Sequence, residues 1–408
     1  MNGESVLGEL GTFDVENYGD LLYPVLFERM LRKRNQAWEV HKFSFIHTES
    51  MQGCGYITRP VQQLFSSNQE RLRALVVGGG DLLRTDWNLV ASHYRSIYLR
   101  RKGGFPLRDL PVLFARLLGK RVDFAAQFRS RHMNYPAVGP FIIDPAKLSN
   151  VKLVAYCSCG VPFPFGEDVR SQVANVINKS SFIYLRDRQS RDRLVEAGVQ
   201  QEIHVGPDLI VALSDFFDPV VERERGRSIL QKQGVDIRRH ILCVQCRPQG
   251  KRDTLELAEQ LRAYQERTAC DVILIPIGRC HGDEDYLKEL ARTSCGAFKY
   301  IEIYSIFDIL SVLAACNIFL GTSLHGNITA FSFGIPHLFA PIAVAKADGF
   351  LDVVNLAREL RLKSWAEVNQ KLDMVTSLDR DYFSARVSAA KRRVNEGFDL
   401  LLQAVAKE

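Results

Sequence analysis

The segment of the sequence best suited to chemistry is residues 321–327, Gly-Thr-Ser-Leu-His-Gly-Asn. It follows an apolar run that predicts a strand and precedes an apolar helix, and residues 309–345 contain no Lys, Arg, Asp or Glu. The first turn of a helix has unpaired N–H groups that favour an anion. His325 there can exchange a proton near neutral pH, although a lone histidine is more often a core residue. The predicted anion site comprises Thr322, Ser323, Leu324, His325 and Gly326.

Two other polar segments are candidates for ligand contact. The first, residues 17–20 (Asn-Tyr-Gly-Asp), precedes a predicted helix, so Asn17 or Asp20 is alternatively a helix N-cap. The second, residues 78–81 (Gly-Gly-Gly-Asp), follows an apolar run, and its glycines let the backbone approach a ligand or simply form a tight turn. Neither segment matches a dinucleotide or P-loop motif. The candidate ligand contacts here are Asn17, Gly79, Gly80 and Asp81.

Three cationic side chains follow predicted strands. Arg186 and Arg247 each come directly after an apolar run, and a guanidinium can bind a carboxylate or phosphate through two parallel hydrogen bonds. Lys346 follows the last predicted strand and would add a point charge. For Arg186 the alternative is a surface ion pair with Asp187, with Ser190 as the helix cap.

The elements that must position these residues follow a βα rhythm. Apolar runs of strand length alternate with helix-period segments, which is typical of parallel sheets. This predicts an α/β protein with two Rossmann-like domains facing a cleft, the GT-B arrangement of many glycosyltransferases, divided into residues 1–215 and 216–408. Ligands of such sheets bind at the carboxyl ends of strands, where the candidate residues lie. The predicted strands are 5–8, 40–45, 74–78, 122–128, 153–159, 182–185, 203–205, 240–246, 272–277, 300–303, 317–320 and 336–339.

Composition narrows the class of protein. The chain has 408 residues, of which 46% are hydrophobic. Its net charge of +6 fits an anionic partner but is too small for a protein that coats nucleic acid. The nine cysteines are odd in number and lie mostly in apolar runs, without a paired Cys/His knuckle, so we expect reduced core residues and no metal site. The N-terminal sequence lacks the features of a signal peptide, and no 18-residue apolar run occurs, so we expect a cytoplasmic protein.

A basic segment interrupts the first half of the chain. Residues 94–121 contain eight Lys or Arg against a single acid, Asp109, with apolar residues interleaved. Such a segment can rest on an anionic membrane surface or meet a lipid-linked pyrophosphate acceptor. We therefore consider peripheral contact with the inner face of a membrane. The alternative is the solvated face of a helical insertion.

In the order and spacing of five motifs the sequence resembles the polysaccharide pyruvyl transferase family, over residues 8 to 346. The family has an N-x-G-D motif, a G-G-G strand, an R-D-x-x-S stretch, a P-D pair and an R-L-H-G segment followed by G-x-P and a lysine. One position departs from the pattern: the family arginine before Leu-His-Gly is Ser323 here. The matching segments are residues 17–20, 78–80, 186–198, 207–208, 324–326 and 334–336, with Lys346.

The resemblance implies transfer of pyruvate from phosphoenolpyruvate to two hydroxyls of a sugar, as in exopolysaccharide biosynthesis, on a polysaccharide or its lipid-linked precursor. The donor carries a carboxylate and a phosphate, which suit arginines and a helix N-terminus. His325 would protonate its methylene carbon, and Asp20 or Asp81 would serve as base. No metal or cofactor is required.

The departure at Ser323 leaves three possibilities open. Arg247, Arg186 or Arg279 replaces the missing arginine, and Arg279 is the first to examine because it follows a neighbouring predicted strand. Alternatively the donor is a nucleotide-sugar and the protein a GT-B glycosyltransferase. The third possibility is a catalytically inactive family member.

Overall fold

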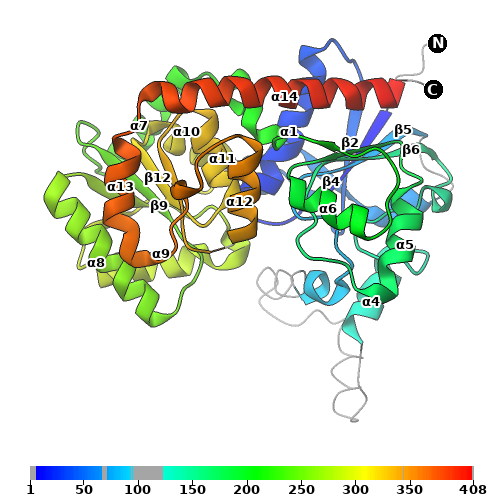
Figure 1. Ribbon diagram of the computed structural model, residues 1–408, viewed down its shortest axis with the longest axis horizontal. Coiled ribbons are helices and arrows are strands. Elements are labelled where there is room, and N and C mark those ends of the chain that lie inside the picture. The colour runs from blue at the N-terminus through cyan, green and yellow to red at the C-terminus, as the bar shows by residue number, and fades with distance from the viewer. Residues whose placement is uncertain (1–5, 67–70, 93, 95–122, 343, 407–408) are drawn as a thin grey trace.

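The computed structural model describes residues 6–66, 71–92, 94, 123–342 and 344–406, and shows two lobes side by side (Figure 1). Each lobe contains its own β-sheet. In the basic segment 94–121, only Tyr94 is among the described residues, so the predicted membrane contact lies outside them.

The first lobe is built on an eight-stranded sheet with the order β3-β4-β2-β1-β5-β6-β7-β8. Its neighbouring strands run parallel, except for the antiparallel pair β3 and β4. The central strands are apolar and almost fully buried, as expected for a parallel sheet covered on both faces. The strands are β1 (Val6–Leu10), β2 (Glu39–Ser44), β3 (Thr48–Glu49), β4 (Ile57–Pro60), β5 (Leu72–Gly78), β6 (Val151–Cys159), β7 (Phe182–Leu185) and β8 (His204–Val205).

The second lobe has a five-stranded, wholly parallel sheet with the order β11-β10-β9-β12-β13. The order reverses direction between β9 and β12, which is the kind of place where open α/β sheets bind ligands. The strands are β9 (Ile241–Gln245), β10 (Asp271–Leu274), β11 (Phe298–Tyr300), β12 (Ile318–Gly321) and β13 (His337–Phe339).

Helices connect most successive strands, so each lobe is a Rossmann-like domain and the prediction of two such domains is confirmed. The short 3₁₀ helices that bear on the site are η5 (Leu209–Asp215) and η6 (Arg279–His281). The α-helices are α1 (Tyr18–Lys33), α4 (Phe124–His132), α5 (Glu167–Ile177), α6 (Arg188–Glu196), α7 (Pro219–Lys232), α8 (Lys251–Thr268), α9 (Asp283–Thr293), α10 (Ile306–Ala315), α11 (Leu324–Ser332), α12 (Val344–Val353), α13 (Val368–Thr376) and α14 (Arg380–Ala406).

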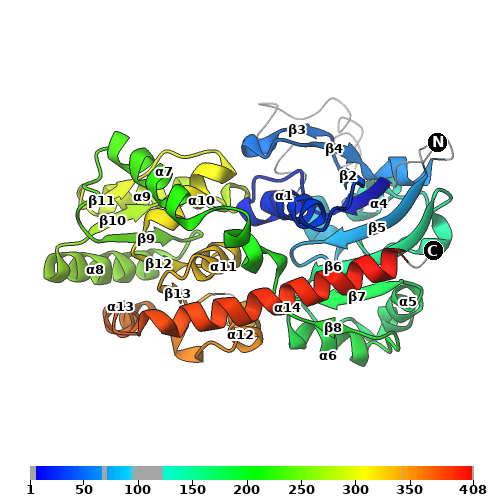
Figure 2. The ribbon, with the colours of Figure 1, turned by 90° about the horizontal axis from the view of Figure 1, so that it is seen from above.

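The last helix, α14, joins the two lobes. Figure 2 shows it running along both of them. It packs on the first lobe through the rings of Phe398 and Phe27, whose centroids are 5.2 Å apart, and the carbonyl of Val405 accepts a hydrogen bond from Arg73 Nε at 2.8 Å. One hydrophobic core therefore continues from α1 through η5 into the second lobe. The predicted second domain, residues 216–408, thus ends in a helix that packs against both sheets.

One predicted strand is wrong. Residues 122–128 were expected to form a strand, but residues 124–132 form helix α4. The carboxylate of Asp123 caps this helix by accepting a hydrogen bond from the Ala126 N–H at 3.0 Å. A short apolar run cannot distinguish strand from helix by periodicity, and here the cap favours the helix.

The charge-free stretch 309–345 folds into α10, β12, α11 and β13, in the core of the second lobe. Nowhere in the described residues does a helix combine the length and the apolarity needed to span a membrane.

Candidate functional site

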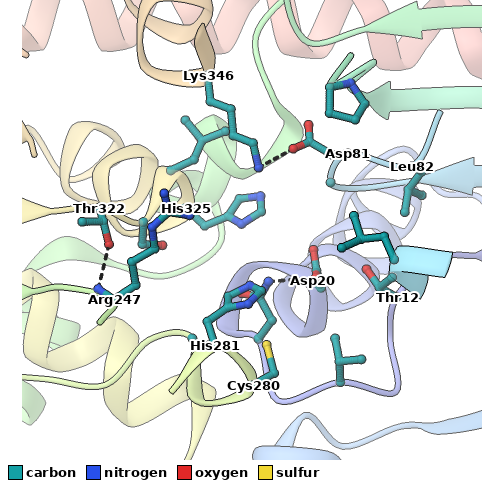
Figure 3. Close-up of a pocket in the computed structure, with 18 of the residues that line it drawn as sticks. Thr12, Asp20, Asp81, Leu82, Arg247, Cys280, His281, Thr322, His325 and Lys346 are labelled. Atoms are coloured by element: carbon teal, nitrogen blue, oxygen red, sulfur yellow. Dashed lines mark hydrogen bonds and ion pairs between the residues drawn. The ribbon is translucent and has the colours of Figure 1, made fainter. Parts of the chain in front are cut away.

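A cavity of about 410 Å³ lies between the lobes, where loops leave the carboxyl ends of strands from both sheets (Figure 3). Three of the predicted site residues, Gly79, Gly326 and Arg279, are not part of its wall. The predicted residues that line it are Asn17, Asp20, Gly80, Asp81, Arg186, Arg247, Thr322, Ser323, Leu324, His325 and Lys346. The structure therefore brings most of the predicted set together, while their chemical roles stay predictions.

Helix α11 begins at the cavity wall with Ser323 as its N-cap. The Ser323 Oγ accepts a hydrogen bond from the Gly326 N–H at 3.2 Å. Its own N–H donates to Gln245 Oε1 at 2.8 Å, which fixes the turn between β12 and α11. The residue that stands where the family has an arginine is thus part of the helix cap, and it directs the first turn of α11 toward the cavity.

The imidazole of His325 is held between the two lobes. On one side it lies against Gly19 of α1, so closely that a β-carbon at position 19 would overlap the ring. On another side its Nε2 is 4.0 Å from Oδ2 of Asp208, which itself is 2% exposed. This Oδ2 has no hydrogen-bond partner within the described part of the chain. Asp208 therefore acts on His325 by charge.

Burial lowers the pKa of His325 below the ordinary histidine value. The negative charges of Asp208 and Asp20 raise this pKa, and the positive charges of Arg186 and Lys346 lower it. Because burial dominates, the ring loses its proton more readily in the free protein than a solvated histidine does.

Asp81 joins two cations across the cavity. Its carboxylate contacts both Arg186, which follows β7, and Lys346 of α12 in the other lobe (Figure 3). Burial raises the pKa of Asp81, but the two cations outweigh burial and hold it well below the usual carboxyl range. Arg186 is 6% exposed, and its Nη1 also lies 3.9 Å from Asp208 Oδ2. The alternative for Arg186, a surface pair with Asp187, does not form; the Asp187 carboxylate caps α6 at Ser190 N.

The N-terminal end of α1 fixes the first lobe against the second. The Tyr18 N–H donates to the Ile277 carbonyl at 3.2 Å, and Asn17 forms a β-bridge with Gly278. The Asn17 side chain caps no helix N–H; its Nδ2 donates to Asp20 Oδ2 at 2.9 Å. Asn17 thus orients the carboxylate of Asp20 at the cavity wall.

The remaining arginines take different places. Arg247 is exposed and lines the cavity, and its backbone N–H donates to Thr322 Oγ1 at 3.1 Å (Figure 3). Arg279 instead forms an ion pair with Glu284, and its Nη2 donates to the Ile303 carbonyl. These contacts occupy Arg279, which does not line the cavity, so its role as the replacement for the family arginine stays a prediction without support from its position. Arg247 has the better position.

The wall residues that were not predicted include the polar or charged residues Arg84, Gln245, His281 and Asp283. Gln245 Nε2 donates to Asp283 Oδ2 at 2.6 Å, while Gln245 Oε1 accepts from the Ser323 N–H. The buried pair of Gln245 and Asp283 therefore holds the turn at Ser323 in place. Burial raises the pKa of Asp283 to about 6, and burial lowers that of His281. A polar residue at the end of an apolar run was the sequence signal for Gln245. No group of three or more His, Cys, Asp or Glu in the described ranges is arranged to hold a metal ion, and the absence of a metal requirement stays a prediction.

The fold and cleft define the GT-B class. A glycosyltransferase from Rickettsia africae is 13% identical, with a TM-score of 0.52 and coverage of 100% of this chain and 97% of that one. HepE of Anabaena, solved with UDP and glucose, is 13% identical, with a TM-score of 0.54 and coverage of 98% and 100%. A UDP-GlcNAc 2-epimerase from Methanocaldococcus jannaschii is 12% identical, with a TM-score of 0.51 and coverage of 92% and 94%. At these identities they show the fold alone.

The chain belongs to the polysaccharide pyruvyl transferase family, whose sequence model matches residues 123–340, more than half of the chain. The resemblance inferred from the motifs is thereby confirmed. No curated protein matches the sequence significantly.

Proposed function

We propose that the protein transfers pyruvate from phosphoenolpyruvate to two hydroxyls of a sugar in a polysaccharide or its lipid-linked precursor, and so forms a cyclic ketal. One observation carries the proposal: four cations, Arg84, Arg186, Arg247 and Lys346, line one cavity that also holds His325. Family membership supports the same reaction.

The cations match the donor's two anionic groups. The first turn of α11 offers N–H groups, and Arg247 is held beside it by the bond to Thr322. Arg186 and Lys346 already share a carboxylate, that of Asp81, so the site is built to hold a negative group between them. We propose that Arg247 replaces the family arginine at Ser323. A charge-assisted hydrogen bond contributes about 1.5–3 kcal/mol, which corresponds to roughly 10–150-fold in affinity.

The reaction can then be written with its atoms balanced. His325 donates a proton to the methylene carbon of the donor, and the adjacent carbon becomes an oxocarbenium centre. A sugar hydroxyl attacks that centre and passes its proton to Asp20, whose charge acts on His325 across the cavity. The second hydroxyl then attacks the same carbon and passes its proton to His325, which is neutral after the first step. The C–O bond to the phosphate breaks as the ketal ring closes, and Asp20 gives its proton to the leaving phosphate.

His325 must be protonated to act as the acid. Burial favours its neutral form in the empty site. A donor with a carboxylate and a phosphate brings negative charge beside the ring and offsets Arg186 and Lys346, so it favours the protonated form. We propose that the donor itself supplies the conditions under which His325 becomes an acid.

The test is an incubation of the protein with phosphoenolpyruvate and a panel of methyl glycosides, followed by phosphate release and product mass. We expect glycoside-dependent phosphate release and a product heavier by one pyruvate less one water. His325→Gln should abolish both, while Asp192→Asn on the exposed surface of α6 should change neither. Consumption of UDP-glucose in a parallel incubation, with phosphoenolpyruvate untouched, would favour a glycosyltransferase instead.

A further inference from the structure

The apolar part of the cavity wall comes mainly from the first lobe, which also supplies Asp20, Asp81, Arg84 and Arg186. Apart from Leu324 and Cys280, the apolar and aromatic residues of the wall come from the first lobe. Two of them, Phe163 and Leu89, are also among the few large hydrophobic side chains that are strongly exposed, at 65% and 44%. The first-lobe set is Val15, Leu82, Leu89, Val90, Tyr94, Pro162 and Phe163.

The loop that carries Phe163 is anchored at both of its ends. It spans residues 160–166, between the carboxyl end of β6 and the start of α5. At one end the Val161 N–H donates to Ser190 Oγ at 2.8 Å, and Val161 is 1% exposed. At the other end Phe165 is 5% exposed, and its carbonyl accepts a hydrogen bond from Arg170 Nε at 3.1 Å. Between the buried anchors Val161 and Phe165, Phe163 and Pro164 are exposed.

The prolines on both sides of Phe163 restrict the backbone of this loop. Pro162 and Pro164 have φ fixed by their rings, and a residue that precedes proline, as Phe163 does, is restricted to extended backbone. An ordered loop loses little conformational freedom when a ligand binds it. An exposed aromatic ring is costly to leave in water and gains most when a flat apolar surface covers it.

We propose that Phe163 is the platform on which a pyranose ring of the acceptor rests, with Leu89 in the same cavity wall. The proposal rests on the proposed function, because it places the acceptor sugar of that reaction on the first lobe. A pyranose has a face of C–H groups that packs on an aromatic ring, while its hydroxyls stay free to react. Continuity of this wall with the one that holds Asp20 and His325 puts such a sugar next to the proton-transfer groups.

A nucleobase also stacks on aromatic rings, and the test below distinguishes it from a sugar. Cations line the cavity from both lobes, Arg84 and Arg186 from the first and Arg247 and Lys346 from the second. The choice of a sugar therefore rests on the place of Phe163 in the wall that also holds Asp20 and His325.

Saturation-transfer NMR tests the platform directly. The probes are methyl β-D-galactopyranoside, methyl β-D-glucopyranoside and methyl α-D-mannopyranoside, each with wild type, Phe163→Ala, Phe163→Trp and the control Val195→Ala, which alters an exposed apolar residue of α6. We expect transfer to the ring C–H protons of at least one glycoside. Phe163→Ala should weaken its affinity about tenfold, which corresponds to about 1.4 kcal/mol, while Phe163→Trp and the control keep it.

Two results would overturn the platform: no glycoside receives saturation from wild type, or Phe163→Ala binds as wild type does. Loss of UDP binding in Phe163→Ala, with glycosides unaffected, would assign the ring to a nucleobase and also overturn it. Calorimetry with phosphoenolpyruvate separates this inference from the proposed function. Phe163→Ala should bind that donor as wild type does, and failure of wild type to bind it would contradict the proposed function without touching the glycoside result.

Discussion

Gly19 and His325 meet across the cleft, at the point where the N-terminus of α1 docks on the second lobe. A β-carbon at Gly19 would overlap the Nδ1 and Cγ atoms of the imidazole. Gly19 is the glycine of the Asn-Tyr-Gly-Asp segment, and His325 is the histidine of Leu-His-Gly. Two motifs that are 306 residues apart (325 minus 19) are therefore one packing unit.

Gly19→Ala should displace the imidazole and impair the reaction. We expect a fall in kcat of at least about tenfold, together with a loss of about 1–3 kcal/mol in the free energy of unfolding, as for other overpacked cores. Steady-state kinetics and urea unfolding measure the two effects. Gly250→Ala is the matched control, since only Asp253 Oδ2, at 3.8 Å, would come near its added methyl group. Normal turnover in Gly19→Ala would show that the contact with His325 is not required.

Asp208→Asn should shift the pH dependence of the reaction toward acid. The negative charge of Asp208 raises the pKa of His325, so its removal lowers that pKa further. If protonated His325 is the active form, kcat/KM falls as pH rises through this pKa, and in the variant the fall starts at lower pH. A pH–rate profile measures this. An unshifted profile would mean that Asp208, despite its position 4.0 Å from Nε2, does not act through His325.

Donor binding should take up protons. The empty site favours neutral His325, and the anionic donor favours the charged ring, so affinity for phosphoenolpyruvate should fall as pH rises from the lowered pKa of the empty site to the higher pKa of the complex. Calorimetry in buffers of different ionisation enthalpy counts the protons. His325→Gln should abolish the uptake. Equal uptake in that variant would assign it to another group, such as His281.

Ser323→Arg should not restore a lost function if Arg247 already holds the donor. The change removes the cap on Gly326 N–H and should cost about 0.5–2 kcal/mol in the free energy of unfolding. Arg247→Gln should weaken phosphoenolpyruvate binding at least about tenfold, whereas Ser323→Arg should strengthen it by less than that. The opposite ranking of the two variants would mean that Arg247 does not compensate.

Glu9 in the centre of β1 predicts a pH-dependent stability. It is fully buried, neither carboxylate oxygen has a hydrogen-bond partner in the described residues, and burial raises its pKa well above 4.5 despite the charge of Lys42. The folded state keeps this proton after the unfolded state has lost it, so the free energy of unfolding falls as pH rises above about 4.5. Glu9→Gln should remove this slope and be more stable at alkaline pH. Denaturant unfolding between pH 5 and 9 measures the free energy of unfolding of both proteins. The same dependence on pH in wild type and Glu9→Gln would contradict the prediction.

Most of the architecture could be predicted from the sequence because parallel strands in the core are continuous apolar runs. Strand β7, for example, was predicted with its bounds at residues 182–185. The prediction of a strand at 122–128 was wrong because the length and composition of this run suit a strand or a helix. The N-cap Asp123 favours the helix. The role of α14 was missed, since pairing between distant segments leaves no local pattern.

The site was predictable where polar residues end apolar runs, and less so where side-chain direction matters. Arg279 and Arg247 both follow strands. Arg279 forms an ion pair with Glu284 and does not line the cavity, whereas Arg247 does. The sequence indicated Asp208 only as a member of a family motif. Its place beside His325, with an Oδ2 atom that has no hydrogen-bond partner in the described residues, depends on a contact between the lobes, which no local pattern predicts.

The central claim is that this cavity binds phosphoenolpyruvate, and calorimetric titration of the purified protein tests it without an acceptor. Inorganic phosphate and UDP-glucose are titrated in parallel. Saturable binding of phosphoenolpyruvate, tighter than phosphate and weakened in Arg247→Gln but not in the surface control Arg191→Gln, is the predicted result. Saturable binding of UDP-glucose without binding of phosphoenolpyruvate would contradict the account.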